Sequence, residues 1–299
     1  MRKHVLGGAT LIVVLLILGI LNCASQNLLS RGAINENNYQ QIAALTMAVS
    51  RLPEEAALAG YYTAHEDPTV DCVSGSKVIK KTKSKRVKIS YDGCDYENIT
   101  WTGTIQQPAD QEKFPYTIIF GQNNSNFGFF QRDATFFAPF TEQIGFAFRG
   151  DFSVENTEDV NVLSGSNLDV HIQNSTFDDL YTFRNMNVNR SYDSGKAHYG
   201  FTIITEINSD LLPTIDCEVT SRFQRYEDQY PYEGAMSIVA IDDNSQVDIQ
   251  VLPETDQVLL RLDSDNDTIF EQEQMLSWEE IKQYLPTAYQ SLFSYYWHS

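Results

Sequence analysis

The chain has 299 residues, of which 42% are hydrophobic, so it is long enough to bury a large core and its composition excludes a disordered protein. It carries 21 basic and 40 acidic residues; Arg2 and Lys3 lie within residues 1–22, which contain no acid, so the remainder has 19 basic residues and a net charge of −21. A body this acidic is repelled by phosphate backbones, which excludes nucleic acid as a partner.

The N-terminus begins with a basic pair followed by an apolar stretch from Val5 to Leu21. A membrane-spanning helix needs about 20 apolar residues, whereas the core of a signal peptide needs about 7–15. The densest part of the stretch, "LIVVLLIL", has eight residues. This length favours an export signal.

Ile20, Leu21 and Asn22 precede Cys23, and this order resembles a bacterial lipoprotein signal, in which an apolar residue and two small residues precede the cysteine that becomes acylated. Leu21 and Asn22 are bulkier than that pattern prefers, so an uncleaved single-span anchor and ordinary secretion remain as alternatives. All three place the body outside the cytoplasm. Under the lipoprotein interpretation, Ala24 implies by resemblance no inner-membrane retention signal, and we expect an outer-membrane anchor facing the periplasm.

The predicted organisation is a signal peptide or membrane anchor over residues 1–22, a tether over 23–35, and a β-rich periplasmic domain over 36–299. A helix is expected from Asn37, because Ile42, Leu45, Val49 and Leu52 recur at steps of three and four residues. Asn35 or Asn37 can cap its start, and Pro53 marks a break before a last turn that ends at Gly60. Its face lacks lysines, so we expect it to pack on the body and not on a membrane surface.

From Tyr61 to about Phe270, short stretches of alternating apolar and polar residues follow one another, separated by Gly, Asn or Asp. This pattern predicts a mainly β fold: a large antiparallel sheet, an open barrel or a sandwich, with one N-terminal helix and a short C-terminal helix. The polar stretch 156–166 suggests two β-lobes, 61–155 and 167–275. Near the end, Ser277 and Glu280 have the spacing of a capping box, Pro286 ends that helix, and the aromatic tail is expected to dock on the body.

Three cysteines follow Cys23, and their spacing matches no zinc site. A hairpin that turns about Lys83 pairs Lys81 with Lys85 and, carried outward, Cys72 with Cys94. We therefore predict a disulfide between Cys72 and Cys94, which an oxidising compartment permits. Cys217 is interpreted as a small buried apolar residue and not as a reactive thiol.

Lysines and arginine concentrate in this hairpin, where seven basic residues occupy twelve positions without an acid: Lys77, Lys80, Lys81, Lys83, Lys85, Arg86 and Lys88. The hairpin is thus a positive region on an acidic protein. It can dock on lipid headgroups, anionic polysaccharide or an acidic protein. The alternative is that the lysines keep an edge strand soluble.

The segment "DSDNDTIFEQEQ" places Asp263, Asp265 and Asp267 at alternating positions, as in calcium loops. Thr268 and Gln274 stand where an EF-hand needs glycine and glutamate, so the EF-hand interpretation fails. A looser calcium loop completed by Glu271 or Glu273 remains a hypothesis, and an acidic turn facing water is the alternative. Calcium is the single cofactor that the sequence suggests.

Aromatic residues gather in "NFGFFQRDATFFAPF", which can line an apolar cavity but is more typical of a core. Asp169 and His171 share one face of a strand, yet a hydrogen-bonded histidine explains that spacing equally well. Established hydrolase, zinc-protease, P-loop and dinucleotide motifs do not occur in the sequence. No catalytic residue is therefore assigned.

The cysteine pair, "YPYEGAMSIVAIDD" (230–243) and "VLLRLDSDNDTIFEQEQMLSWEE" (258–280) resemble segments of uncharacterised Gram-negative envelope lipoproteins. The resemblance implies a β-rich envelope protein and carries over no catalytic residue. We predict a membrane-anchored protein with a binding or structural role toward lipid, polysaccharide or protein. An exported hydrolase of polysaccharide or peptide and a calcium-stabilised adhesion module are the alternatives.

Overall fold

The structure is a computed structural model, and it describes residues 33–54, 56, 72–81, 86–96, 99–108, 116–120, 128–131, 145–156, 160–173, 178–193, 196 and 198–298. The segment 1–22, Cys23 and most of the tether lie outside these residues. Among the described helices, none is both long and apolar enough to cross a membrane.

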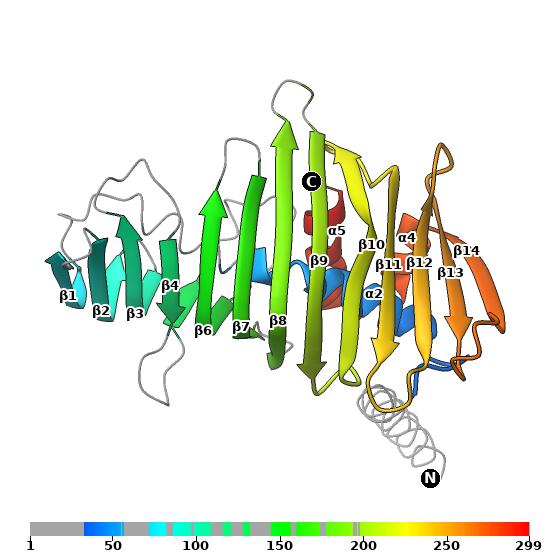
Figure 1. Ribbon diagram of the computed structural model, residues 1–299, viewed down its shortest axis with the longest axis horizontal. Coiled ribbons are helices and arrows are strands. Elements are labelled where there is room, and N and C mark those ends of the chain that lie inside the picture. Colours follow the sequence, from blue (N-terminus) through cyan, green and yellow to red (C-terminus); the bar gives the residue numbers. More distant parts are fainter. Residues whose placement is uncertain are drawn as a thin grey trace, which may run out of the picture.

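Within the part of the chain that the structure describes, fourteen strands form one antiparallel sheet (Figure 1). In chain order they are β1 (Ser74–Lys81), β2 (Arg86–Tyr96), β3 (Ile99–Pro108), β4 (Tyr116–Phe120), β5 (Gly128–Gln131), β6 (Gly145–Asn156), β7 (Val160–Gln173), β8 (Asp178–Asp193), β9 (His198–Ser209), β10 (Ile215–Tyr226), β11 (Glu233–Ala240), β12 (Gln246–Leu252), β13 (Gln257–Asp263) and β14 (Gln272–Ser277). Neighbours in sequence are neighbours in the sheet, except that β4 pairs with β6 and β5 pairs with β3 and β6. The predicted mainly β fold is confirmed, in its form of a large open antiparallel sheet. β6 ends at Asn156 and β7 begins at Val160, and these two strands are adjacent and antiparallel in the same sheet.

One face of the sheet forms the core because the strands alternate in burial. In β11 and β12, Met236, Ile238, Val247 and Ile249 are at most 1% exposed, while the residues between them are half-buried. An alternating sequence sends apolar side chains to one face of a pleated strand, so these strands bury them on a single side. We call this side the helix face.

Among the described residues, the helices that cover the helix face are α2 (Tyr39–Ser50), α4 (Trp278–Gln283) and α5 (Thr287–Trp297). Figure 1 shows them together behind the half of the sheet that contains β8 to β14. The Trp297 indole donates to the carbonyl of Met47 at 3.0 Å and its ring lies 5.9 Å from that of Phe201. The two ends of the described chain thus pack on each other and on the sheet.

The N-terminal helix differs in detail from the prediction. It begins after Asn38, which makes no side-chain cap hydrogen bond, and α2 ends at Ser50. Asn38 instead accepts the backbone N–H of Asn35, so the asparagines stabilise the turn before the helix. The described part confirms packing on the body, and every residue of α2 except Gln40 and Gln41 is buried. Gly60 lies outside the described residues.

At the C-terminus, the predicted capping box is confirmed. Ser277 accepts the backbone N–H of Glu280 through its hydroxyl, and its own N–H donates to the Glu280 carboxylate at 2.7 Å. The tail after Pro286 docks on the body as expected. It does so as α5, a helix that the sequence analysis did not anticipate.

Candidate functional site

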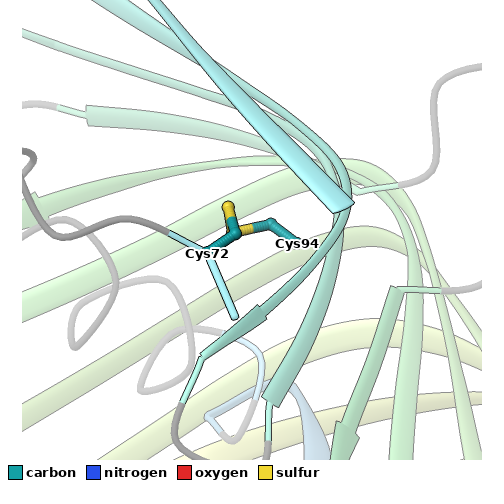
Figure 2. Close-up of a disulfide and its surroundings, with 2 residues drawn as sticks. All are labelled: Cys72 and Cys94. Carbon is teal, nitrogen blue, oxygen red and sulfur yellow. A yellow bond between two sulfur atoms is a disulfide. The ribbon is translucent and has the colours of Figure 1, made fainter. Parts of the chain in front are cut away.

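The disulfide between Cys72 and Cys94 is confirmed and closes the base of the β1–β2 hairpin (Figure 2). The Cα atoms are 5.2 Å apart. The predicted register is wrong by two residues, because Lys81 pairs with Val87 and not with Lys85. The register shifts again between Ser74 and Ser76. The cysteines are therefore not ladder partners: Cys72 precedes β1, and Cys94 pairs across the sheet with Trp101 of β3.

Gly75 makes this irregularity possible. Its φ of +75° favours glycine, and a Cβ at this position would lie 1.9 Å from the carbonyl oxygen of Gly93. A side chain there would separate the strands at the point where the disulfide joins them. The base of the hairpin therefore depends on Gly75 as well as on the cysteines.

The lysines gather at the end of the hairpin opposite the disulfide. Lys80 and Lys88 are direct cross-strand partners, and Lys81 follows on the other face. The acids of the described hairpin, Asp92 and Asp95, pair with serines near the disulfide. Like charges directly opposite each other destabilise a strand pair, so an anion that binds between Lys80 and Lys88 relieves this repulsion.

Exposure makes this end of the hairpin accessible. In β1 every residue is exposed except Lys77, which is half-buried, and Val78 is 48% and Ile79 44% exposed. Lys83 and Lys85 lie outside the described residues, and Arg86 is described by its backbone alone. The cationic hairpin is defined below as Lys77, Lys80, Lys81 and Lys88.

The four predicted calcium ligands come together. Asp263 ends β13 and is 3% exposed, while Asp265, Asp267 and Glu271 are exposed, and one carboxylate oxygen from each lies within 4.8 Å of the others. Asp263 accepts the backbone N–H groups of Asp267 and Thr268 at 3.2 and 2.9 Å, and Glu271 accepts that of Ser264 at 2.7 Å. These bonds shape the turn without an ion, so calcium stays a hypothesis.

Asp169 and His171 do not act as a pair. Asp169 is 5% exposed and accepts hydrogen bonds from Arg149 Nε at 2.7 Å and Thr182 Oγ1 at 2.8 Å. His171 instead contacts the carboxylate of Asp178. Asp169 of β7 therefore forms an ion pair with Arg149 of β6 and a hydrogen bond with Thr182 of β8.

Cys217 is a free thiol that is 1% exposed on the helix face. Burial, with a smaller contribution from Asp216 and Glu218, raises the pKa of its thiol to about 12. A thiolate is the nucleophilic form, so this residue packs and does not react. Cys23 and the side chains of the aromatic run lie outside the description.

Sequence reasoning missed an ionic cluster on the helix face. Arg51, at the end of α2, donates to both carboxylate oxygens of Glu54 at 2.7 and 2.9 Å, and Arg190 of β8 lies 3.5 Å from the same carboxylate. Arg225 of β10 stacks 4.5 Å above the ring of Tyr199. The sequence contains one signal for this ionic cluster: Arg51 and Glu54 are oppositely charged and three residues apart at the end of an apolar helix.

Arg51 and Glu54 are both buried, and the pKa values of the two groups reflect their ion pair. Burial on its own raises the pKa of the Glu54 carboxyl, but Arg51, with help from Arg190 and Arg225, shifts it below the ordinary value. Burial lowers the pKa of Arg51, and Glu54 more than restores it. Both groups are charged at neutral pH.

Comparison with protein-family models, curated proteins and solved structures finds no match.

Proposed function

We propose that this protein is a membrane-anchored envelope protein with a binding role and no catalysis, and that its cationic hairpin contacts anionic lipid headgroups. The observation that carries the proposal is the cross-strand pairing of Lys80 with Lys88 at the exposed end of the sheet. The lipoprotein-like sequence before Cys23 supports it, since an anchor would hold the body beside a bilayer. Lipid is therefore preferred over polysaccharide or an acidic protein.

Electrostatics favour this contact despite the negative charge of the whole chain. A lysine near an anionic bilayer surface contributes about 1 kcal/mol, and the attraction decays within about 8–10 Å at ordinary salt. At that range the local charge of the hairpin matters more than the net charge of −19. The competing interpretation is that the lysines only prevent β1 from pairing with another strand.

Residue-specific lysine acylation distinguishes the two interpretations. We would reconstitute the full chain into vesicles of zwitterionic lipid alone or mixed with an anionic lipid, and measure acylation rates by mass spectrometry. Lipid contact predicts that Lys80, Lys81 and Lys88 react severalfold more slowly on anionic vesicles, while Lys196 and Lys282 do not change. At about 1 M salt, where the Debye length is about 3 Å, the difference should vanish.

Matched variants sharpen the test. Lys80→Gln with Lys88→Gln removes two charges from the hairpin, and Lys196→Gln with Lys282→Gln removes two elsewhere. Lys81 should lose its protection in the first variant and keep it in the second. Equal acylation rates on both vesicle types would overturn the proposal. Protection by an anionic polysaccharide on neutral vesicles would assign the hairpin to polysaccharide.

The anchor is tested separately by the intact mass and N-terminal peptide of protein purified from membranes. An acylated Cys23 at the N-terminus supports the lipoprotein form, and a retained Met1 supports the uncleaved anchor. The hydrolase and calcium-module hypotheses rank lower. Calcium added during thermal melting tests the acidic turn, because a ligand that binds the native state raises the melting midpoint.

A further inference from the structure

We infer that copies of this chain associate edge to edge, with β14 of one copy beside β1 of the next. The inference goes beyond the proposed function, because its partner is a second copy of the chain and not a lipid. It rests on the place of the two strands in the sheet, on the charge that each carries, and on the exposure of their side chains.

β1 and β14 are the two edges of the described sheet. The strand order begins with β1, which pairs with β2, and ends with β14, which pairs with β13. Figure 1 shows the two strands at opposite ends of the sheet. Alternate residues of an edge strand direct their backbone N–H and C=O groups away from the sheet, where another strand can pair with them. A second copy can therefore extend the sheet at either end.

The two edges carry opposite charge. Residues 77–88, which include the end of β1, hold seven basic residues and no acid, whereas residues 263–280, which include β14, hold seven acidic residues and no base. A contact of β1 with β1, or of β14 with β14, would bring like charges together and is disfavoured. Charge therefore selects the contact of β14 with β1, which repeats from copy to copy in a head-to-tail manner.

The charged side chains of these edges are available to a partner. Glu273 of β14 is exposed, and Arg261, which lies opposite it, has its guanidinium 3.6 Å from a different carboxylate, on β12. Lys80 and Lys81 of β1 are exposed as well. A carboxylate from the next copy would also relieve the repulsion between Lys80 and Lys88, which face each other across the hairpin.

Apolar side chains are exposed on the same two edges. Met275 of β14 is 62% exposed, and Val78 and Ile79 of β1 are 48% and 44% exposed. Removing apolar surface from water is favourable, so a strand that pairs with β1 gains from covering these residues. Val78 and Ile79 are consecutive and therefore lie on opposite faces of the strand. The contact thus buries apolar surface on both faces of the sheet.

The topology sets the direction of the contact. Neighbours in the strand order are antiparallel, and β1 and β14 stand first and thirteenth in this order. The two strands therefore run in the same direction. When two copies lie side by side with their helix faces on the same side, β14 and β1 form a parallel pair with evenly spaced, slanted hydrogen bonds.

The test is zero-length cross-linking of lysines to carboxylates in an equal mixture of isotopically light and heavy full chain, in a zwitterionic detergent. The two edges lie at opposite ends of one sheet, so a cross-link between them joins two copies. We expect mixed-isotope peptides that join Lys80 or Lys81 to Glu273, together with species larger than the monomer in sedimentation velocity. At about 1 M salt, where the Debye length is about 3 Å, both should decrease severalfold.

Charge-reversal variants assign the contact. Lys80→Glu and Glu273→Lys should each weaken association severalfold, because each brings like charges together, and the two changes in one chain should restore it. Lys196→Glu and Asp242→Lys are the matched controls: both residues are exposed, lie in turns between inner strands of the sheet, and should leave association unchanged when reversed. If Glu273→Lys fails to fold beside Arg261, Glu273→Gln replaces it and should also weaken association.

Two results would overturn the inference. The first is a chain that stays monomeric at low salt at every concentration tested and gives no cross-link between the edges, which would show that the lysines only keep β1 from pairing. The second is equal association of the edge variants and the control variants, which would place the contact elsewhere on the molecule.

This inference and the lipid contact can fail separately. Detergent without anionic lipid tests association alone, whereas the acylation experiment compares two lipid compositions. Lys88 lies on β2, one strand inside the edge, and remains available to lipid when Lys80 faces the next copy. Cross-links between the edges without lipid-dependent protection of Lys88 would retain the association and remove the lipid contact. Protection of Lys88 on anionic vesicles by a chain that gives no such cross-link would do the reverse.

Discussion

The hydroxyl of Tyr289, on α5, donates a hydrogen bond of 2.5 Å to the carboxylate of Asp179, on β8. The same hydroxyl accepts a hydrogen bond of 2.8 Å from Tyr181, two residues further along the strand. Tyr181 is fully buried and Tyr289 is 2% exposed. Three side chains from two elements thus share one polar chain inside an apolar layer, and this chain fixes where the last helix docks.

Tyr289→Phe should destabilise the protein by about 1–3 kcal/mol, because the buried hydroxyl of Tyr181 and the carboxylate of Asp179 lose their partner. Urea unfolding measures the loss. Tyr192→Phe, at a residue that is 39% exposed, is the control and should change stability by less than about 0.5 kcal/mol. Equal unfolding midpoints for the two variants would show that the hydrogen-bond chain does not stabilise α5.

Asp179 gives the stability a pH dependence of defined sign. Burial is the largest of the effects that raise the pKa of its carboxyl above 3.8, and Asp178 and Asp210 add to it, while Tyr289 and His171 oppose it. A folded-state pKa above the unfolded value means that protonation favours folding. This contribution is complete below the unfolded pKa and disappears as the pH rises through the folded pKa.

Asp179→Asn should therefore gain stability relative to the wild type as the pH rises from below 3.8 through the folded pKa. Unfolding by urea at a series of pH values measures the difference. Asp242→Asn, in an exposed turn, should run parallel to the wild type. Parallel curves for all three proteins would refute the assignment of the shift to Asp179.

Glu54→Gln should destabilise the protein by about 3–5 kcal/mol, since it leaves the buried guanidinium of Arg51 without a counter-charge. The pKa of the Glu54 carboxyl is lowered in the folded state, so its contribution to stability is present above the ordinary value of 4.5 and is lost as the pH falls through the folded pKa. In Glu54→Gln, the free energy of unfolding should not show this decrease at low pH, because the side chain cannot be protonated there.

Asp193→Asn is the control for this prediction. It breaks an ion pair with Lys196 in which the side chains are 48% and 76% exposed, and such exposed pairs contribute about 0–1 kcal/mol. If Asp193→Asn and Glu54→Gln destabilised the protein equally, burial would not strengthen the contribution of the Glu54 ion pair to stability.

Local patterns predicted the strands and the C-terminal capping box well, but not the start of the N-terminal helix, which begins after Asn38 without a side-chain cap. The alternation of "EGAMSIVA" and "QVDIQVL" matches β11 and β12, because one face of each strand is covered by helices and the other is not. The Ser277–Glu280 box marked the start of α4, because capping depends on residues three apart. The helix α5 was missed although Tyr289, Phe293 and Tyr296 have helical spacing, since its aromatic composition is equally typical of strands.

Features that join distant residues were not accessible from local patterns. Arg190 of β8 approaches Glu54 only because the segment that follows α2 lies beside β8, and the chain between the two residues contains several strands. The hairpin register failed because the position of the turn was misjudged: Lys81, beside the turn, already pairs with Val87, and the irregularity near Gly75 adds a second departure from the regular ladder. The acidic turn could be found because all its members lie within nine residues.

Cys217 should resist alkylation in the folded protein. A pKa of about 12 leaves roughly a thousandfold less thiolate at pH 8 than an ordinary thiol with a pKa of 9, and the sulfur is buried as well. Peptide mapping after iodoacetamide treatment should find Cys217 unmodified until urea is added. Rapid modification of the native protein would show that this part of the helix face opens.

Replacing Cys72 and Cys94 together by alanine should destabilise the hairpin locally. The bond joins residues separated by 22 positions, for which the chain-entropy relation gives about 3 kcal/mol. β1 lies at the end of the described strand order and pairs there with β2, so little else holds it. Amide hydrogen exchange should therefore become faster in β1 and β2 and stay unchanged in β11 to β13.

The control for the cysteine pair is Cys217→Ala, which removes a buried sulfur near the start of β10. It should accelerate exchange around β10 and leave the hairpin protected, the reverse of the pattern expected for the disulfide variant. Since unfolding of a whole domain exposes all amides equally, a uniform loss of protection in the disulfide variant would mean that the hairpin and the helix-covered strands unfold as one unit. The cationic hairpin would then be part of the core fold, and not a separately stabilised edge.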